Sequence, residues 1–376
     1  MQVVISGIGT AVPAHQCRQQ EAGEVAAKFC SATPEQAHML SILYRMSGVN
    51  TRGSVVLDRA EGPLTDRQEF FPPCTPEFPN GPTTEARLQL FAEEAGPLAM
   101  EASRQALERS GISSSAVTHL ITVTCSGFVA PGFDFTLINQ LPLRPDVART
   151  QIGFMGCHAA LNALRVAHAF VAADPRAVVL ICCVELCTLH YQYGWDPEQI
   201  VANSLFADGS GACIVQADTT ASHGSNGATN GARTRTLDRI VASGSIMLPD
   251  SDDAMTWRVG DHGFRMTLSS RVPGILAEHL RGWMTNWLAN FGLTPEQIVT
   301  WAVHPGGPRI LNAFAEAMSI SPDALSISRE IMQTHGNMSS PTVLFVLDRL
   351  RRDKASGPCV AIGFGPGLVA EATLLR

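Results

Sequence analysis

The segment Gln151-Ile-Gly-Phe-Met-Gly-Cys157-His-Ala-Ala-Leu-Asn-Ala-Leu-Arg165 predicts a strand, a tight turn and a helix in immediate succession. Its apolar start ends at Met155-Gly156, and the helical pattern then continues to about Ala172. Pro175 precedes a second apolar run, 177–184, which we expect to be a buried strand. Strands that alternate with helices in this way indicate an α/β protein with buried sheets.

The alternation extends outward along the whole chain. Helices are expected over residues 84–111, about 273–291 and 340–350, and strands over 117–124, 212–215, 239–243, 298–303, 359–364 and 368–375. Ser340 is expected to be the N-cap of its helix and Pro341 its first residue. Residues 219–236, rich in Ser, Gly, Asn and Thr, are expected to be a loop that connects two halves, 1–218 and 237–376.

Composition excludes several classes of function. The chain has 376 residues, a formal net charge of −7 and a pI near 5.9, which argue against a nucleic-acid partner because phosphate contacts need clustered cations. The sequence has no signal-peptide pattern and no long apolar run, so membrane insertion is not expected. The ten cysteines are scattered without a CxxC pair, which argues against a metal site and favours the reducing cytoplasm.

Cys157 is the first candidate catalytic residue. It stands at a strand-to-helix turn, where unpaired N–H groups and the helix dipole favour an anion. Such a position lowers the pKa of a thiol and raises the fraction of nucleophilic thiolate. A buried, inert cysteine is the commoner case, so the position alone does not establish a role.

His304 and Asn337 supply the missing chemistry. His304 ends an apolar strand and is followed by Pro-Gly-Gly-Pro308, a rigid turn that allows close approach of a substrate. A lone His is more often structural. Asn337 precedes a helix and could merely cap it, but Ser340 is expected to fill that role, which leaves the Asn337 amide free. An imidazole N–H and an amide N–H at one point form an oxyanion hole. With a cysteine, they point to carbon–carbon bond formation on thioesters.

Four segments together resemble the signature sequences of type III polyketide synthases, the chalcone-synthase-like condensing enzymes. They are 153–165 around Cys157, His304-Pro-Gly-Gly-Pro-Arg-Ile-Leu311, Gly336-Asn-Met-Ser-Ser340 and Gly363-Phe-Gly-Pro-Gly-Leu368. The matches follow the family's order over residues 126 to 368. The run Met-Gly-Cys157-His-Ala-Ala-Leu-Asn is similar to that of bacterial members that extend fatty acyl starters.

The resemblance implies a thiolase fold with layers αβαβα and two similar halves, a homodimer, and no metal or prosthetic group. It also implies that Cys157 accepts the starter acyl group from a CoA thioester. His304 and Asn337 would hold the malonyl thioester carbonyl and stabilise the enolate left by decarboxylation. His304 would in addition keep Cys157 as a thiolate.

The resemblance also implies a substrate cavity. Phe206 matches a gatekeeping Phe, Met266 stands in place of a second gatekeeping Phe, and Trp257 replaces a Gly. Trp257 should close one wall of the cavity, whereas Cys125 and Ala130 should open another direction. The implied cavity residues are Phe206, Cys125, Ser126, Ala130, His190, Trp257, Met266, Ser339 and Pro366.

Recognition of CoA is implied less completely. Arg45 matches one basic residue that contacts CoA phosphates, but two companion lysines are replaced by Ile42 and Val49. The remaining candidates are Arg271, Arg309, Gly306 and Gly307. Delivery of the starter by an acyl carrier protein is the alternative.

The resulting expectation is an iterative decarboxylative acyltransferase that uses malonyl-CoA and, as its leading product class, forms alkylpyrones or alkylresorcinols. A ketoacyl synthase III-like enzyme, with one condensation on a carrier protein, is the nearest alternative. A catalytically silent acyl-CoA-binding scaffold is another. A cysteine protease also uses Cys, His and Asn, but its family signatures are absent from the sequence.

Overall fold

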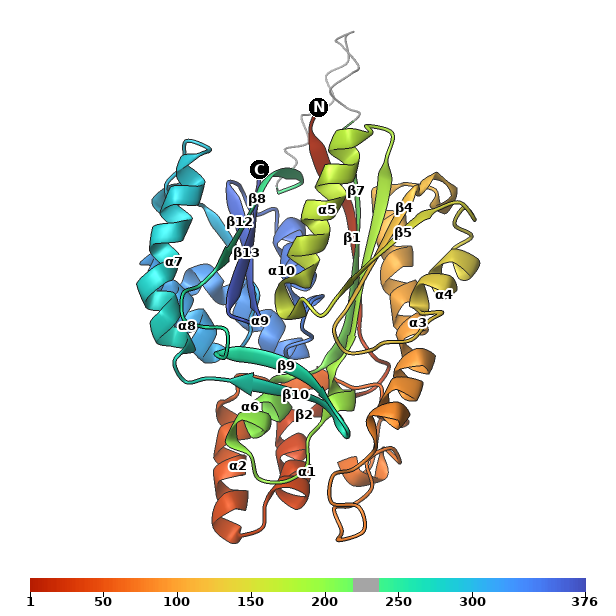
Figure 1. Cartoon of the computed structure of the whole chain (residues 1–376), viewed down its shortest axis with the longest axis vertical. Helices are drawn as coiled ribbons and strands as arrows, with labels where there is room; N and C mark the ends of the chain where they lie inside the picture. The colour runs from red at the N-terminus through yellow and green to blue at the C-terminus, as the bar shows by residue number, and fades with distance from the viewer. Residues whose placement is uncertain (219–236) are drawn as a thin grey trace.

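A computed structural model of the chain describes residues 1–218 and 237–376 (Figure 1). The predicted connecting loop, 219–236, lies outside these described residues.

The helices are α1 Gln19–Cys30, α2 Pro34–Met46, α3 Thr84–Ser110, α4 Phe133–Gln140, α5 Ala159–Ala173, α6 Pro197–Leu205, α7 Val272–Ala289, α8 Pro308–Met318, α9 Ser326–His335 and α10 Thr342–Arg352. The strands are β1 Val3–Ala11, β2 Gln16–Arg18, β3 Thr51–Gly53, β4 His119–Thr124, β5 Ala148–Gly153, β6 Val178–Leu186, β7 Asp208–Ala217, β8 Arg239–Met247, β9 Met255–Gly260, β10 Gly263–Leu268, β11 Thr300–Val303, β12 Cys359–Gly365 and β13 Val369–Leu375.

Strands from residues 1–218 and from residues 237–376 join in one mixed sheet. Within the described residues its order is β11-β12-β13-β8-β1-β7-β6-β4-β5. The strands of the two parts meet where β1 pairs with β8, through Val3 with Ile240 and Val4 with Arg239. β9 and β10 form a separate antiparallel ribbon.

Helices and strands alternate in layers (Figure 1). α5 and α10 are buried in the middle, between strands of both parts. α3 packs on the outer side of β1, β6 and β7, and α7 and α8 pack on the outer side of β11, β12 and β13. The α/β layering expected from the sequence is therefore present.

A separate apolar core forms around α1, α2 and α6, which lie below these layers (Figure 1). Its buried residues come from β2, α1, α2, α6 and the segment 54–71, and it includes Phe29, Leu40 and Phe71. We call it the α1–α2 core. The β9–β10 ribbon lies between this core and the layered body.

The start of α10 corrects one prediction. The helix begins at Thr342 with Pro341 as its N-cap, so Ser340 is not the cap. The Ser340 hydroxyl instead donates to the Glu185 carboxylate over 2.6 Å. A buried carboxylate is stable only with hydrogen-bond donors, and the Ser340 hydroxyl serves as one of them instead of capping the helix.

Candidate active site

His304 stands at the carboxyl end of β11. Its backbone N–H donates to the Ile362 carbonyl of β12 over 2.8 Å, which fixes the residue beside the parallel neighbour strand. The side chain is 1% exposed, and neither ring nitrogen has a hydrogen-bond partner among the described residues. A buried imidazole with both nitrogens unpaired is ready to accept or donate a proton.

Cys157 lies in a short 3-10 turn, Gly156–His158, that leads into α5. Gly156 has a φ of +66°, and a Cβ at this position would lie 2.5 Å from the Pro366 ring. A glycine is therefore required for the 363–368 segment to pack directly against the cysteine turn.

Asn337 follows α9 and is joined to the end of α6. Its backbone N–H donates to the Leu205 carbonyl over 2.8 Å, and its carbonyl accepts from the Ala207 N–H over 2.9 Å. The side-chain oxygen accepts from the Ser339 N–H over 2.8 Å, which orients the amide and leaves its NH2 group as a donor.

The structure brings these three residues together. Cys157, His304 and Asn337 line one cavity of about 310 Å³, although they lie up to 180 positions apart in the chain. The rest of the lining is mostly apolar, from Met255, Met266, Leu268, Gly306, Ile310 and Phe364. We call this the triad cavity.

Burial shifts the pKa values of both Cys157 and His304. It raises the pKa of the Cys157 thiol to about 11, with hydrogen bonds from Ser339 and Asn337 acting in the opposite direction. Burial, together with the neighbouring His158, lowers the pKa of His304 to about 3. Burial therefore favours the neutral thiol and the neutral imidazole, whereas the helix N-terminus favours the thiolate.

A second cavity, of about 330 Å³, is also lined by Cys157. It contains six of the implied cavity residues, namely Cys125, Phe206, Trp257, Met266, Ser339 and Pro366. Cys187, which the sequence did not indicate, lines it as well. We call this the central cavity.

Three implied cavity residues lie elsewhere. The Ser126 hydroxyl is buried and donates to Glu185 over 2.6 Å, so it belongs to a polar network behind the cavity wall. Ala130 is exposed in the loop between β4 and α4. His190 stacks on Phe264 at 4.0 Å and faces a third cavity described below.

Glu185 is the centre of that network and was missed from the sequence. Its oxygens accept from the backbone N–H of Cys125 at 3.0 and 3.2 Å, and from the hydroxyls of Ser126 and Ser340. The Cys125 thiol also donates to it over 3.3 Å and lies 3.4 Å from the Ser339 hydroxyl. The carboxylate therefore ties the loop after β4 to the segment that carries Asn337.

Models of known families match both parts of the chain. Residues 2–219 match the N-terminal domain of chalcone and stilbene synthases, and residues 239–376 match the C-terminal domain. The chain belongs to this family, the type III polyketide synthases. It is an acyltransferase of the condensing type, with the thiolase-like α/β fold that the sequence predicted.

Relatives cover nearly the whole chain. It is 30% identical over 377 residues to the alpha-pyrone synthesis polyketide synthase-like Pks18 of Mycobacterium tuberculosis, covering 99% of this chain and 90% of that protein. It is 29% identical to the 1,3,6,8-tetrahydroxynaphthalene synthase of Streptomyces peucetius, over 99% and 92% of the two chains. The solved structure of PKS-I from the brown alga Ectocarpus siliculosus superposes with a TM-score of 0.88 at 29% identity, covering 100% and 98%.

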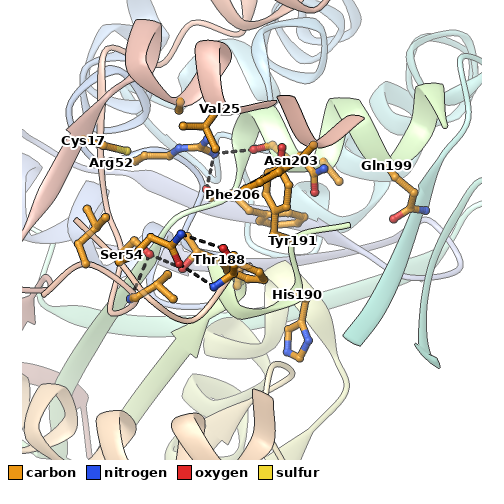
Figure 2. Close-up of a pocket in the computed structure, with 18 of the residues that line it drawn as sticks. Cys17, Val25, Arg52, Ser54, Thr188, His190, Tyr191, Gln199, Asn203 and Phe206 are labelled. Carbon is orange, nitrogen blue, oxygen red and sulfur yellow. Dashed lines mark hydrogen bonds between the residues drawn. The ribbon is translucent and has the colours of Figure 1, made fainter. Parts of the chain in front are cut away.

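This type III polyketide synthase has a third and larger cavity, of about 850 Å³ (Figure 2). We call it the apolar cavity. It shares Cys187, Phe206, Trp257 and Met266 with the central cavity. Met266 lines all three cavities, so a change in this one side chain alters the passage between them.

Phe206 is held from its backbone. The Arg52 guanidinium donates to the Phe206 carbonyl over 2.9 Å and to the Asn203 carbonyl over 2.5 Å (Figure 2). Arg52 is buried, and no sequence motif indicated its role. It fixes the C-terminal end of α6, where Phe206 enters the cavity wall.

The residues implied for CoA binding lie at the triad cavity or on the protein surface. Gly306 lines the triad cavity, and Gly307 lies next to Leu205. Arg45 and Arg309 are exposed at the end of α2 and the start of α8. The Arg271 guanidinium pairs with Asp253 on the surface.

Two further findings concern the described ranges only. No cluster of three or more His, Cys, Asp or Glu residues in them is arranged to hold a metal ion. No helix in residues 1–218 or 237–376 is long and apolar enough to cross a membrane.

Proposed function

We propose that this enzyme condenses malonyl-CoA repeatedly onto a long-chain fatty acyl starter carried by Cys157, and cyclises the product to a pyrone or a resorcinol-type ring. The observation that carries this proposal is the apolar cavity, which shares four residues with the central cavity beside Cys157. An extended hydrocarbon chain needs such a space, because it gains about 0.8 kcal/mol for each methylene removed from water.

Loading of the starter begins with a neutral Cys157 thiol and a neutral His304 imidazole. The unpaired imidazole of His304 accepts the Cys157 proton, and the thiolate attacks the starter thioester carbonyl. A carbon–sulfur bond to Cys157 forms, the bond to the CoA sulfur breaks, and His304 returns the proton to CoA.

Extension uses the same cavity. The malonyl thioester oxygen accepts hydrogen bonds from His304 and from the NH2 group of Asn337, while the carboxylate leaves as CO2 and its electron pair becomes an enolate. The enolate carbon attacks the acyl carbonyl on Cys157, and the Cys157 sulfur leaves as thiolate. The lengthened acyl-CoA reloads Cys157 for the next cycle.

The test is product analysis with purified protein, malonyl-CoA and a series of acyl-CoA starters. Pyrones or resorcinols that contain several malonyl-derived units support the proposal, and Cys157→Ala is expected to abolish them. A single condensation on an acyl carrier protein would identify the ketoacyl synthase III-like alternative. Absence of CO2 release would identify a silent scaffold.

We further propose a homodimer built around the β5 edge of the sheet. Phe128, Val129, Phe135 and Met155 are exposed on segments near this edge, and exposed apolar side chains of this density favour an interface. Phe135→Glu should shift the mass measured by light scattering from dimer to monomer, whereas Met247→Glu, at an exposed site on β8, should not. All cysteines in the described residues are free thiols, which supports a cytoplasmic location.

A further inference from the structure

Two sets of residues in the lining of the apolar cavity differ in their surroundings. Cys187, Phe206, Trp257 and Met266 also line the central cavity, and we call them the gate. A second set belongs to the α1–α2 core and is formed by Cys17, Ala22, Phe29, Leu57 and Phe71, with Val25, Val56, Leu64 and Tyr191 packed on it. No gate residue is in that core, so the cavity extends from the gate to the α1–α2 core.

Three aromatic rings stand on the wall formed by that core. The Phe29 and Tyr191 ring centroids are 6.2 Å apart, and those of Phe71 and Tyr191 are 5.9 Å apart, both in edge contact. All three rings line the cavity. We call Phe29, Phe71 and Tyr191 the aromatic wall.

The aromatic wall is supported from behind. Tyr193 stacks on Phe29 with centroids 4.9 Å apart and an interplanar angle of 9°. The guanidinium carbon of Arg87 lies 5.4 Å from the Phe71 ring centre, and Arg87 is itself fixed by hydrogen bonds of 2.6 and 2.8 Å to the carbonyls of Leu189 and Tyr191. Rings that pack against further rings and a fixed guanidinium in this way do not move aside without loss of core contacts.

Met266 of the gate differs from the aromatic wall in this respect. Met266 has three rotatable side-chain bonds and a polarizable sulfur, so it adapts to a chain that passes beside it. An acyl chain can therefore pass the flexible Met266 side chain but is stopped by the rigid aromatic wall, so the distance between them limits the length of the chain. We propose that the aromatic wall sets the longest starter acyl chain that the enzyme extends. This inference rests on the proposed use of the apolar cavity for the acyl chain.

A definite dependence on chain length follows. Each methylene that enters the cavity should raise kcat/KM about fourfold, from about 0.8 kcal/mol for each buried CH2 group. The gain should stop when the chain reaches the aromatic wall, because further carbons meet packed rings. A plot of log kcat/KM against chain length should therefore rise and then break.

The experiment compares saturated acyl-CoA starters from hexanoyl to eicosanoyl at a fixed concentration of malonyl-CoA. Phe71→Leu and Phe71→Ala should move the break to longer chains, the second by more than the first. Val25→Phe adds volume to the same wall from α1 and should move the break to shorter chains. Leu40→Ala is the matched control, because Leu40 is buried in the same core and does not line the cavity.

Two further readouts separate the possible failures. Acylation of Cys157 is followed by intact mass, and thermal unfolding of each variant shows that it is folded. A break that stays in place in Phe71→Leu and Val25→Phe, or that Leu40→Ala moves equally, overturns the inference, as does a profile that rises without a break. If the wild-type protein acylates Cys157 but extends none of the starters with malonyl-CoA, the proposed function is wrong, and the inference that rests on it is wrong as well.

Discussion

The indole N–H of Trp257 donates to the Cys125 carbonyl oxygen over 2.7 Å. This bond joins the β9–β10 ribbon to the loop after β4. The Trp257 ring also lies 6.0 Å from the Phe206 ring and 5.7 Å from that of Phe264, measured between centroids. Trp257 is therefore a fixed part of the partition between the central and apolar cavities, both of which it lines.

Removal of this partition should change the starters that the enzyme accepts. Trp257→Gly should widen the opening between the two cavities and increase kcat/KM for branched or aromatic starters about tenfold relative to straight chains, with a loss of unfolding free energy of about 3–5 kcal/mol from the deleted ring. Trp257→Phe keeps most of the ring and removes the hydrogen bond, so it should cost only about 0.5–1.5 kcal/mol. Competition between paired starters, with products separated by mass, measures the ratio. An unchanged product profile in Trp257→Gly contradicts the assignment.

The reactivity of Cys157 should depend on pH in one direction. Burial raises its pKa to about 11, so the thiolate fraction is small at pH 7 and should grow about tenfold for each pH unit up to that value. The rate of inactivation by iodoacetamide should therefore climb continuously between pH 7 and pH 10, with the modified peptide mapped to Cys157. A rate that is constant above about pH 6 would show instead that a thiolate–imidazolium pair with His304 is already formed.

His304 and Asn337 should be separable by two half-reactions. Asn337→Asp keeps an oxygen for the Ser339 N–H but removes the amide donor, so decarboxylation of malonyl-CoA should fall about 100- to 1,000-fold. Starter loading on Cys157 should fall much less, because the proton acceptor remains. His304→Ala should impair both half-reactions. Acetyl-CoA formed from malonyl-CoA and intact-mass acylation measure the two steps, and equal losses in Asn337→Asp would contradict the division of roles.

Much of the layered body was accessible from sequence because its elements are long or strongly apolar. The predicted helix 84–111 corresponds to α3, which ends where Gly111 adopts a φ of +70°. The predicted strands 117–124 and 177–184 correspond to β4 and β6 within two residues. Residues 58–83 contain only a short 3-10 turn at Leu64–Asp66, in agreement with their many prolines.

The α1–α2 core and the β9–β10 ribbon were not predicted, although they form most of the apolar cavity. α1 and α2 are short and carry many polar residues, and their stability comes from packing on each other rather than from a strong periodic pattern. Glu185 and Cys187 were missed because they end an apolar strand, where sequence alone does not show which side chains face a cavity. The carboxylate inside that strand was the available signal, since a buried charge requires donors.

The contact between Ser340 and Glu185 gives a test of what holds the Asn337 segment. The Ser340 hydroxyl is buried and donates to Glu185 over 2.6 Å, so Ser340→Ala should cost about 1.5–3 kcal/mol of unfolding free energy, the range for a hydrogen bond to a charged group. If that loss comes from Glu185, it should shrink in a Glu185→Gln background, with a coupling of about 1–2 kcal/mol in a double-mutant cycle measured by urea unfolding. Ser321→Ala provides the control, because Ser321 caps a distant exposed turn through the Asp323 N–H and should be additive with Glu185→Gln. A Ser340→Ala cost that is the same in both backgrounds would show that the serine stabilises the start of α10 rather than the buried carboxylate.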